Sequence, residues 1–209
     1  MIRLALPKGR YLPPVLRALE QAGLPLPELA SPSRRLVVTL AEPRLEIVLL
    51  RDWDLPLYVE RGAADCGVVG SDVLAERGGE LLVPLRFASL ACRLSWIGRP
   101  GTRPPGPGAP RSVATKYPRL AGELLAARGA AAELVPLSGA VEVALLLGLA
   151  DLALDIVETG RTIADHGLVE IAPERPVEPC FVVQRAAFQI RRREIEALLE
   201  RLEAAGVAA

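Results

Sequence analysis

The feature that most constrains the fold is an alternation of short apolar segments with amphipathic segments, which occurs twice along the chain. The first half predicts strands at residues 2–6, 36–40, 45–50 and 66–70, and helices at 11–22 and 55–61. The second half predicts strands at 112–115, 132–137 and 152–157, and helices at 118–128, 141–147 and, near the end, 186–205. Apolar residues at helical spacing mark the helices, and short apolar runs mark the strands. This alternation is typical of an α/β fold with mostly parallel sheets.

Two short sequence echoes relate the halves. Residues 62–65 (GAAD) match residues 148–151 (GLAD), and each quartet stands between a helix and an apolar strand. Residues 5–8 (ALPK) resemble residues 114–116 (ATK), each at the end of the first strand of its half. Because the order and the structural context agree, we predict two similar lobes, the first of which carries an extra hairpin at residues 36–50.

Two strand-like segments, residues 87–97 and 180–184, fall outside the repeat and are predicted to cross between the lobes. Lobe I then comprises residues 1–88 plus 180–209, and lobe II comprises residues 89–179. A central cleft between two lobes is a common small-molecule site, so we expect the ligand there.

The composition excludes several classes of protein. The chain has 209 residues, of which 51% are hydrophobic, and this suits one large domain or two small lobes. Lys and Arg total 25, as do Asp and Glu, so the chain has no basic footprint for nucleic acid. No apolar run is long enough to cross a bilayer, and the N-terminus does not resemble a secretory signal. We therefore expect a cytoplasmic protein with no nucleic-acid partner and no membrane partner.

The cysteines and the single histidine form no metal or redox pattern. Cys66, Cys92 and Cys180 stand singly in apolar surroundings, which predicts buried, reduced thiols. His166 has no serine or cysteine partner pattern and is expected at the surface. A metal site built from the protein's own His and Cys side chains is therefore not expected.

The segment at residues 155–162 (DIVETGRT) is the main candidate for chemistry, because it joins a buried strand to a segment that can be helical from residue 163 onward. Free N–H groups and the dipole at a helix N-terminus attract phosphate. Gly160 allows the backbone to approach closely, and the hydroxyls of Thr159 and Thr162 can donate to phosphate oxygens. This half of the motif predicts a phosphate site.

The acids in the same segment have a different role. Asp155 and Glu158 repel a phosphate, but carboxylates are acceptors and suit the hydroxyl groups of a sugar. The combination predicts the binding of a sugar 5-phosphate, to which Arg161 either adds positive charge or contributes nothing because it points into solvent. The alternative is purely structural: Thr159 caps the helix and Glu158 is solvated, and short Gly-Thr turns fit both interpretations.

Basic residues follow strand ends as well. Lys8, Gly9 and Arg10 stand between a strand and a helix, although three such residues alone more often form a surface turn. All but two of the 25 basic residues are Arg, and the two lysines, Lys8 and Lys116, lie at the echoed positions. Because a compact ammonium differs from a planar guanidinium, we predict that both lysines meet a ligand in the cleft. Two further cations near strand ends of lobe I are Arg34 and Arg51.

Several stretches together resemble the catalytic subunit of ATP phosphoribosyltransferase. The matching stretches are LALPKGR (4–10), SRRL (33–36), DLPLYVERGAADCGVVGSDVL (54–74), ATKYPRLA (114–121) and GLADLALDIVETGRT (148–162). They span most of the chain and follow the family's order. The resemblance implies an α/β fold of two similar lobes like that of type II periplasmic binding proteins, with a central cleft and crossing inter-lobe strands.

The resemblance also implies a reaction, the first step of histidine biosynthesis. Adenine N1 of ATP attacks the ribose C1 of phosphoribosyl pyrophosphate, and pyrophosphate leaves. Residues 155–162 would hold the phosphoribosyl group, and Lys8, Arg10 and Arg34 match family positions that face the pyrophosphate and triphosphate groups. Mg²⁺ is the expected cofactor, bound to substrate phosphates. Adenine N1 already carries a lone pair, so the attack requires no strong general base.

A regulatory partner is implied in the same way. Long members of the family carry a further C-terminal domain that binds histidine, whereas this chain ends at Ala209, just after its last predicted helix, and resembles the short form. Short forms assemble into hetero-oligomers with a regulatory subunit similar to histidyl-tRNA synthetase. Two alternatives stay open: an anion or sugar-phosphate binding module of the same fold without catalysis, and a phosphoribosyltransferase that acts on another base.

Overall fold

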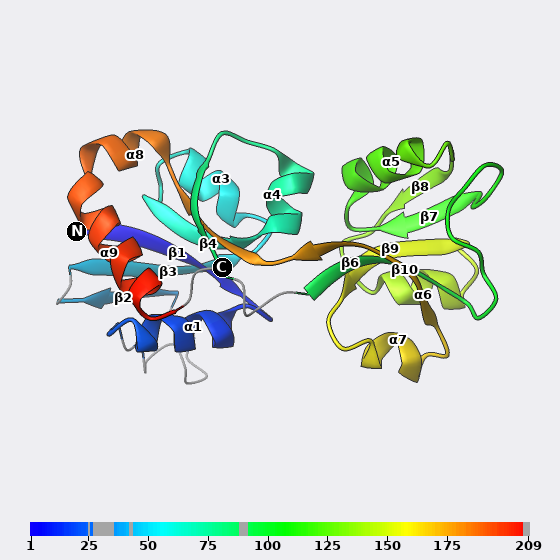
Figure 1. The fold of residues 1–209 in the computed structure, drawn as a ribbon, viewed down its shortest axis with the longest axis horizontal. Coiled ribbons are helices and arrows are strands. Elements are labelled where there is room, and N and C mark those ends of the chain that lie inside the picture. The colour runs from blue at the N-terminus through cyan, green and yellow to red at the C-terminus, as the bar shows by residue number, and fades with distance from the viewer. Residues whose placement is uncertain (25, 27–35, 42–43, 88–91, 207–209) are drawn as a thin grey trace. The chain divides into compact units, whose positions relative to one another are not determined.

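The protein is divided into two compact units. The computed structural model describes residues 1–24, 26, 36–41, 44–87 and 92–206. We call the units lobe I (Met1–Ala91 with Glu178–Ala209) and lobe II (Cys92–Val177), shown in Figure 1. The chain leaves lobe I inside the predicted crossing segment 87–97 and returns directly before the other predicted crossing segment, 180–184. The predicted lobe boundaries lie within a few residues of the observed ones.

Lobe I contains a six-stranded mixed sheet in the order β2-β3-β1-β4-β11-β5. Its strands are β1 (Ile2–Lys8), β2 (Val37–Leu40), β3 (Leu45–Arg51), β4 (Cys66–Gly70), β5 (Leu82–Arg86) and β11 (Pro179–Val183). Its helices are α1 (Leu12–Gln21), α3 (Leu55–Glu60), α4 (Ser71–Arg77), α8 (Arg185–Ile190) and α9 (Arg192–Ala204). In Figure 1, α1 and α3 cover opposite faces of this sheet. Every residue of β4 and β11 is buried, as expected for central strands covered on both faces.

Lobe II contains a five-stranded mixed sheet in the order β10-β6-β9-β7-β8. Its strands are β6 (Cys92–Gly98), β7 (Ser112–Thr115), β8 (Glu133–Pro136), β9 (Leu152–Val157) and β10 (Val169–Val177). Its helices are α5 (Pro118–Ala127), α6 (Val141–Leu146) and α7 (Arg161–Asp165). Figure 1 shows α5 and α6 on opposite faces. The apolar face of α6 packs on β9, which is buried from Leu152 to Leu154.

The two sheets share one plan, which confirms the prediction of two similar lobes. The strands β3-β1-β4-β11-β5 of lobe I correspond to β8-β7-β9-β6-β10 of lobe II, with the same directions. Two details of the prediction are wrong. The sheets are mixed rather than mostly parallel, because the last two strands of each series run antiparallel to their neighbours. Among the strands of the described residues, only β2 is additional in lobe I, because the other strand of the predicted hairpin, β3, has a counterpart in β8.

The GAAD and GLAD echo has a structural cause. Gly62 and Gly148 each follow a helix with a positive φ, +71° and +74°, a conformation that favours glycine. The aspartates that come next bind the start of the first strand in their lobe. Asp65 accepts a hydrogen bond from the backbone of β1 at 2.7 Å, and Asp151 accepts one from the backbone of β7 at 3.1 Å. Each quartet therefore ends a helix and fixes a strand.

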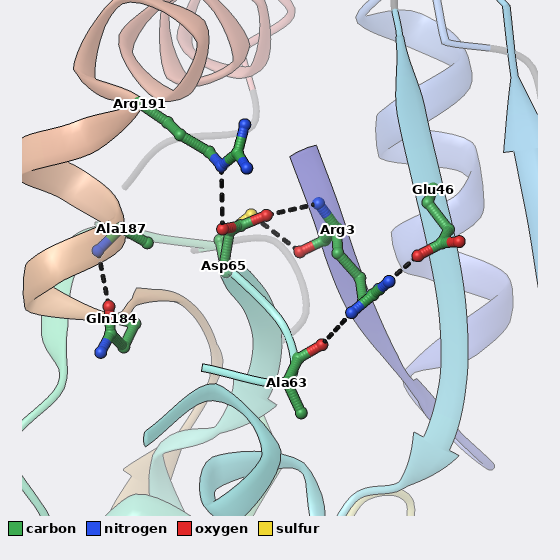
Figure 2. A network of polar contacts seen from close by, with 8 residues as sticks. Arg3, Glu46, Ala63, Asp65, Gln184, Ala187 and Arg191 are labelled. Atoms are coloured by element: carbon green, nitrogen blue, oxygen red, sulfur yellow. Dashed lines mark hydrogen bonds and ion pairs between the residues drawn. The ribbon is translucent and has the colours of Figure 1, made fainter. Parts of the chain in front are cut away.

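Asp65 is also the centre of a polar network in lobe I, shown in Figure 2. Its Oδ1 accepts a hydrogen bond from Arg191 Nε at 3.2 Å, and its Oδ2 accepts one from Arg3 N. The Arg3 guanidinium in turn forms an ion pair with Glu46 and donates to the Ala63 carbonyl at 2.8 Å. The network joins β1, β3, the turn before β4 and the junction of α8 with α9. It therefore holds together the amino ends of the parallel strands.

Three further elements differ from the prediction. The sequence does not predict β5 and β10, which contain Pro84 in one case and Pro173 and Pro176 in the other. Both are edge strands, the position in a sheet to which proline is mostly confined. The predicted final helix is two helices, because Arg191 leaves helical geometry (φ −120°, ψ 30°). Among the described residues, no helix has the length and apolar character that crossing a membrane requires.

The expectations for the cysteines and the histidine are confirmed. Cys66, Cys92 and Cys180 are free and buried. Burial raises the pKa of the Cys180 thiol to about 11, against an opposing effect of Arg86, and it also raises the pKa of the Cys66 thiol. Neither thiol therefore ionises near neutral pH. His166 is exposed at the end of α7.

Candidate active site

The basic residues predicted in lobe I lie together at the carboxyl edge of its parallel strands. Lys8 is the last residue of β1 and pairs in register with Arg51, the last residue of β3. Gly9 follows with a φ of +101°, which favours glycine, and Arg10 leads into α1. Lys8, Arg10 and Arg51 are exposed to solvent. Ligands of α/β sheets bind at this edge, so the three cations are placed where an anion would arrive.

Arg10 is held in place by contacts within lobe I. Its Nη2 lies 3.6 Å from Oδ2 of Asp72, whose side chain is 1% exposed. Its guanidinium also stacks over the Tyr11 ring, 5.0 Å from the ring centroid. A buried carboxylate is stabilised by a cationic partner, so this pairing restrains Arg10. Asp72 is not among the site residues predicted from the sequence, although it follows the buried strand β4 at the same edge.

Gly70 makes this close approach possible. A Cβ atom at Gly70 would lie 2.1 Å from Oδ1 of Asp72 and 3.2 Å from the Tyr11 ring, so any side chain would displace the carboxylate. The turn after Gly70 is fixed to the chain that enters β11. Ser71 N donates to the Glu178 carbonyl at 2.8 Å, and the Ser71 hydroxyl accepts from Glu178 N at 3.2 Å. The position of Asp72, and through it that of Arg10, is thus set by the β4–α4 turn.

The residues predicted in lobe II likewise gather at the carboxyl edge of its parallel strands. Thr115, the last residue of β7, pairs with Leu154 of β9, so Lys116 and Asp155 follow on neighbouring strands. The buried Thr115 hydroxyl donates to the Leu154 carbonyl at 2.7 Å and accepts from Tyr117 N at 2.8 Å. Thr115 therefore holds the turn that carries Lys116 against β9. It is a positioning residue that sequence reasoning missed.

The two lysines are not equivalent in the two lobes. Ala5 of β1 and Ala114 of β7 occupy corresponding positions in the two lobes. Each pairs with the residue of the neighbouring strand that lies two positions after the aspartate of its lobe, Asp65 or Asp151. With these alanines matched, Lys116 corresponds to Pro7 and not to Lys8. The predicted echo of the lysines is therefore wrong by one position, although both lysines lie at the carboxyl edge of their lobe.

The loop after β9 contains the predicted phosphate motif. Gly160 is the N-cap of α7, with a φ of +77°, and the helix begins at Arg161 rather than at residue 163. The Thr159 hydroxyl accepts a hydrogen bond from Arg161 N at 3.3 Å, so Thr159 stabilises the turn without being the cap residue. Because α7 ends at Asp165, its dipole is small. A phosphate here would depend on the N–H groups of the first turn, which have no partner inside a helix.

Arg93 of β6 supports this loop. It donates to the Glu158 carbonyl at 3.3 Å and forms a two-pronged pair with Glu170 of β10 at 2.6 and 2.5 Å. The buried Ser95 donates to the same carboxylate at 2.7 Å and pairs in register with Asp155. The hydrogen bond between Arg93 and Glu170 lowers the pKa of Glu170 and raises the pKa of Arg93, so both side chains stay ionised at neutral pH. Sequence reasoning gave no signal for Arg93.

The carboxylates and hydroxyls of the loop differ in exposure. Asp155 is half-buried, and its Oδ1 accepts a hydrogen bond from Ile156 N at 2.8 Å. The side chains of the loop that face solvent are Glu158, Thr159, Arg161 and Thr162. Acceptor oxygens and hydroxyl donors therefore lie a few residues apart on one edge, as a sugar phosphate requires.

One predicted residue is not placed. Arg34 falls in the segment 27–35, which lies outside the described residues. Within the described ranges, no group of three His, Cys, Asp or Glu side chains is arranged to hold a metal ion.

Comparison with solved structures defines the class of fold. The BvgS periplasmic VFT2 domain of Bordetella pertussis aligns with 97% of this chain and 86% of its own, with a TM-score of 0.61 at 16% identity. The alkanesulfonate-binding protein SsuA of Xanthomonas axonopodis aligns with 98% of this chain and 72% of its own, with a TM-score of 0.60 at 16% identity. The chain thus has the two-lobed α/β fold of periplasmic binding proteins, as the sequence predicts.

Closer matches define the family. The model of the family described as ATP phosphoribosyltransferase matches residues 51–204. The ATP phosphoribosyltransferase of Sorangium cellulosum is 42% identical over 204 residues, covering 98% of this chain and 95% of that protein. The Thermus thermophilus enzyme of the same name is 41% identical over 96% of this chain and 95% of its own. The chain belongs to the ATP phosphoribosyltransferase family.

A solved structure of the ATP phosphoribosyl transferase (HisG:HisZ) complex from Thermotoga maritima agrees with this assignment. It aligns with a TM-score of 0.82 at 28% identity and covers 98% of both chains. The predicted enzyme class is confirmed: the chain is a transferase, and the family's reaction is the phosphoribosyl transfer to ATP that begins histidine biosynthesis. The relatives do not favour the alternative of a binding module without catalysis.

Proposed function

We propose that the two carboxyl edges divide the reaction between them. The edge of lobe II binds the phosphoribosyl group, and the edge of lobe I binds the pyrophosphate that leaves. One observation carries this proposal: each predicted site residue within the described ranges lies at one of these two edges. Such edges are where α/β sheets bind ligands, and surface turns chosen at random would not collect there.

At the edge of lobe II, the loop at 158–162 takes the 5-phosphate and the acids take the ribose. Thr159 and Thr162 donate hydroxyl protons to phosphate oxygens, and the N–H groups after Gly160 add donors. Asp155 and Glu158 accept from the ribose hydroxyls. Arg161 adds positive charge, and Lys116 on the neighbouring strand adds a second cation at the same edge.

At the edge of lobe I, cations stabilise the leaving group. As adenine N1 forms its bond to the ribose C1, the bond from C1 to the pyrophosphate oxygen breaks, and its electron pair leaves with pyrophosphate. Fixed positive charges lower the energy of this transition state because they are already in place when the charge develops. Lys8, Arg10 and Arg51 supply these charges, and Asp72 keeps Arg10 in position. Arg34 completes the set in this proposal.

No residue of the chain is assigned as a strong general base. Adenine N1 attacks with its own lone pair, so the residues only need to hold the base and the ribose in line. Proximity and orientation of this kind supply a large part of a two-substrate rate enhancement.

Mg²⁺ fits the proposal as an ion carried by the substrates. It prefers phosphate oxygens and water to cages made only of protein carboxylates, and no three-acid cluster is present in the described ranges. When bound to the phosphates, it supplies further positive charge for the departing pyrophosphate. The protein's own part is to place cations around that complex and acids at the ribose.

A regulatory subunit is a further part of the proposal. The Thermotoga maritima structure that this chain resembles is a complex of two proteins, HisG and HisZ. We infer that this chain also assembles into a hetero-oligomer with a separate regulatory subunit similar to histidyl-tRNA synthetase. A cytoplasmic location stays a prediction. Co-expression followed by size-exclusion chromatography tests the assembly, which requires both chains to elute in one peak.

The activity test is a direct search for the product. The chain is incubated with ATP, Mg²⁺ and phosphoribosyl pyrophosphate, with and without the regulatory subunit, and the mixture is analysed by mass spectrometry. We expect the adduct of phosphoribose with ATP together with free pyrophosphate. Reactions in which another purine or pyrimidine replaces ATP are the control for base choice. No adduct with ATP in either reaction would rule out the transferase.

A further inference from the structure

We propose that Arg93 is a positioning residue of the phosphoribosyl site, and that this role sets the polarity of its ion pair with Glu170. The inference rests on the proposed binding of the phosphoribosyl group at the edge of lobe II, and it assigns a further residue to that site. Arg93 is the second residue of β6, and Glu170 is the second residue of the edge strand β10. Neither is among the predicted site residues.

The Arg93 guanidinium contacts both an edge strand and the loop after β9. Its Nε and Nη2 form a fork that binds the two oxygens of Glu170, at 2.6 and 2.5 Å. The remaining nitrogen, Nη1, donates to the Glu158 carbonyl at 3.3 Å. Because a guanidinium is planar and rigid, a carboxylate that binds one edge of it also fixes the direction of the third nitrogen. Glu170 thereby aims Nη1 at the first residue of the loop at 158–162.

Holding the Glu158 carbonyl also orients the peptide bond that follows it. A trans peptide is planar, and its C=O and N–H point in opposite directions. With the carbonyl bound to Arg93, the Thr159 N–H points away from Arg93, and the carbonyl oxygen cannot turn toward a phosphate, which is itself an acceptor. The hydrogen bond also polarises the peptide and strengthens its N–H as a donor. Arg93 therefore orients the peptide that leads to the proposed phosphate residues.

Ser95 extends the same arrangement to Asp155. The Ser95 hydroxyl is buried and donates to Oε1 of Glu170 at 2.7 Å. Ser95 pairs in register with Asp155, and residues paired across neighbouring strands place their side chains on the same face of the sheet. Glu170 therefore fixes the neighbours of both acids that we assign to the ribose hydroxyls.

Lobe I contains a corresponding ion pair with reversed charges. When the quartets GAAD and GLAD are matched, Cys180 corresponds to Ser95, because each pairs with the fourth residue after its quartet. Glu178, two residues before Cys180, then corresponds to Arg93. Its partner is Arg86 on the edge strand β5, whose Nη1 lies 2.9 Å from Oε1 of Glu178. In lobe I the cation thus stands on the edge strand and the acid on the neighbouring segment, the opposite of lobe II.

The reversed pair separates what the sheet requires from what the loop requires. Both pairs tie an edge strand to its neighbour, so either polarity serves the sheet. The turn after β4 binds the backbone of Glu178, whose carbonyl accepts from Ser71 N at 2.8 Å, whereas the loop after β9 binds the side chain of Arg93. A carboxylate in place of Arg93 could only accept hydrogen bonds and could not bind a carbonyl. The loop, and not the sheet, therefore requires the cation in lobe II.

The test exchanges the two charges of the lobe II pair. Arg93→Glu/Glu170→Arg rebuilds the ion pair with the polarity found in lobe I, but it moves the cation one strand away from the loop. Arg93→Glu alone breaks the pair. Urea denaturation gives the midpoint of unfolding, and titration calorimetry gives the dissociation constant for phosphoribosyl pyrophosphate. We expect the exchange to recover most of the midpoint lost in Arg93→Glu, while the dissociation constant stays at least about 10-fold above that of the wild type.

Turnover gives a further readout, measured with the regulatory subunit where the wild type requires it. The loop holds the phosphoribosyl group in the ground state and in the transition state alike, so kcat at saturating substrate should change by less than about 3-fold in the exchanged variant. The matched control is Arg86→Gln, which breaks the corresponding pair of lobe I. It should lower the urea midpoint without changing the dissociation constant.

Arg93→Lys keeps the test informative if the exchanged variant does not fold. An ammonium keeps the positive charge beside Glu170 but lacks the planar fork that reaches both acceptors. The variant should therefore be nearly as stable as the wild type and should bind phosphoribosyl pyrophosphate several-fold more weakly. Wild-type affinity in Arg93→Lys, or full recovery of affinity in the exchanged variant, overturns the proposal, because the pair then serves the sheet alone.

Thr159→Val, measured in parallel, distinguishes a failure of this proposal from a failure of the proposed function. If Thr159→Val weakens the binding of phosphoribosyl pyrophosphate and the Arg93 variants do not, only the positioning role of Arg93 is wrong. If none of these variants weakens binding, the phosphoribosyl group is not bound at the edge of lobe II, and both proposals are wrong.

Discussion

At the scale of single residues, Thr159 has two hydrogen-bonding functions that one substitution removes. Its hydroxyl accepts from Arg161 N at 3.3 Å, and it keeps a proton that it can donate to a phosphate. Thr159→Val preserves the shape of the side chain and removes both of these hydrogen bonds. A hydrogen bond to a charged group contributes roughly 1.5–3 kcal/mol, so we expect the affinity for phosphoribosyl pyrophosphate to fall by about 10- to 100-fold. Titration calorimetry measures the change.

Thr39→Val, at an exposed position of β2, is the control for a threonine that belongs to neither edge. If Thr159→Val keeps its full affinity, Thr159 serves the turn alone. Gly160→Val is a poorer test, because a β-branched residue at a φ of +77° is strained and the fold would change together with binding.

Arg10 and Asp72 allow stability and turnover to be separated. Arg10→Ala removes a cation 3.6 Å from a buried carboxylate, so we expect a loss of about 1–3 kcal/mol in the free energy of unfolding, together with a fall in kcat that exceeds the rise in KM. The double variant Arg10→Ala/Asp72→Asn removes the charge that had been left behind. It should regain most of the stability and none of the turnover. Urea denaturation and steady-state kinetics give the two quantities, and a double variant that regains turnover would refute the role of Arg10.

Which site residues the sequence reveals depends on how far their contacts reach along the chain. Lys8 to Arg10 and the segment 155–162 were found because each motif follows a strand end in one stretch. Asp72 and Arg93 were missed because each acts on a loop more than sixty residues away, Asp72 through Arg10 and Arg93 through the Glu158 carbonyl. One sequence gives no signal for a pairing at that separation. The sequence predicts the residues proposed to contact the ligand, but it does not predict the distant residues that hold them in position.

At the scale of elements, the edge strand β10 is held by charge as well as by its ladder. Arg93 and Ser95 of β6 both bind the Glu170 carboxylate, and the Arg93 hydrogen bond lowers the pKa of Glu170. A carboxyl whose pKa is lower in the folded state stabilises the fold fully above its unfolded pKa of about 4.3, and this contribution is lost as the pH falls through the lower folded value. The β10 edge should therefore weaken in acid.

Glu170→Gln tests this. At neutral pH we expect the variant to be less stable than the wild type by about 1 kcal/mol, since the pair is partly exposed. The gap should narrow below about pH 4, because the wild-type carboxyl then also loses its charge. Urea denaturation over a pH series measures this difference in the free energy of unfolding. The control for the loss of one negative charge is Glu133→Gln, which changes an exposed glutamate at the start of β8. A gap that stays constant with pH contradicts the assignment.

Central and edge strands differ in how well the sequence predicts them. The parallel strands β1, β4, β7 and β9 are apolar runs because both faces are covered, and their predicted positions agree with the structure. The edge strands β5 and β10 contain prolines and charged residues, so nothing local distinguishes them from loops. Their pairing with β11 and β6 makes them strands, and pairing is a property of the whole sheet.

At the scale of the whole molecule, the echo predicted more than any single motif. GAAD and GLAD are four residues each, yet they mark the same turn and the same strand contact in two sheets of one plan. The echo could not show that β2 is the only added strand of lobe I among the elements compared, nor that the last two strands of each series are antiparallel. The antiparallel strand β11 of lobe I belongs to the segment that returns to that lobe after Val177.

Because the chain returns to lobe I after completing lobe II, we expect the two lobes to differ in whether they can fold alone. Lobe II is one continuous stretch, whereas the sheet of lobe I is completed by β11, which lies between β4 and β5. We expect a fragment of residues 92–177 to melt cooperatively by circular dichroism, because it keeps all the strands of its sheet. A fragment of residues 1–91 lacks β11, the strand with which β5 pairs in the described part of the chain, and should show no cooperative melt until a peptide of residues 178–209 supplies β11, α8 and α9. Cooperative melting of the 1–91 fragment alone would show that β11 docks onto a lobe already formed and does not complete it.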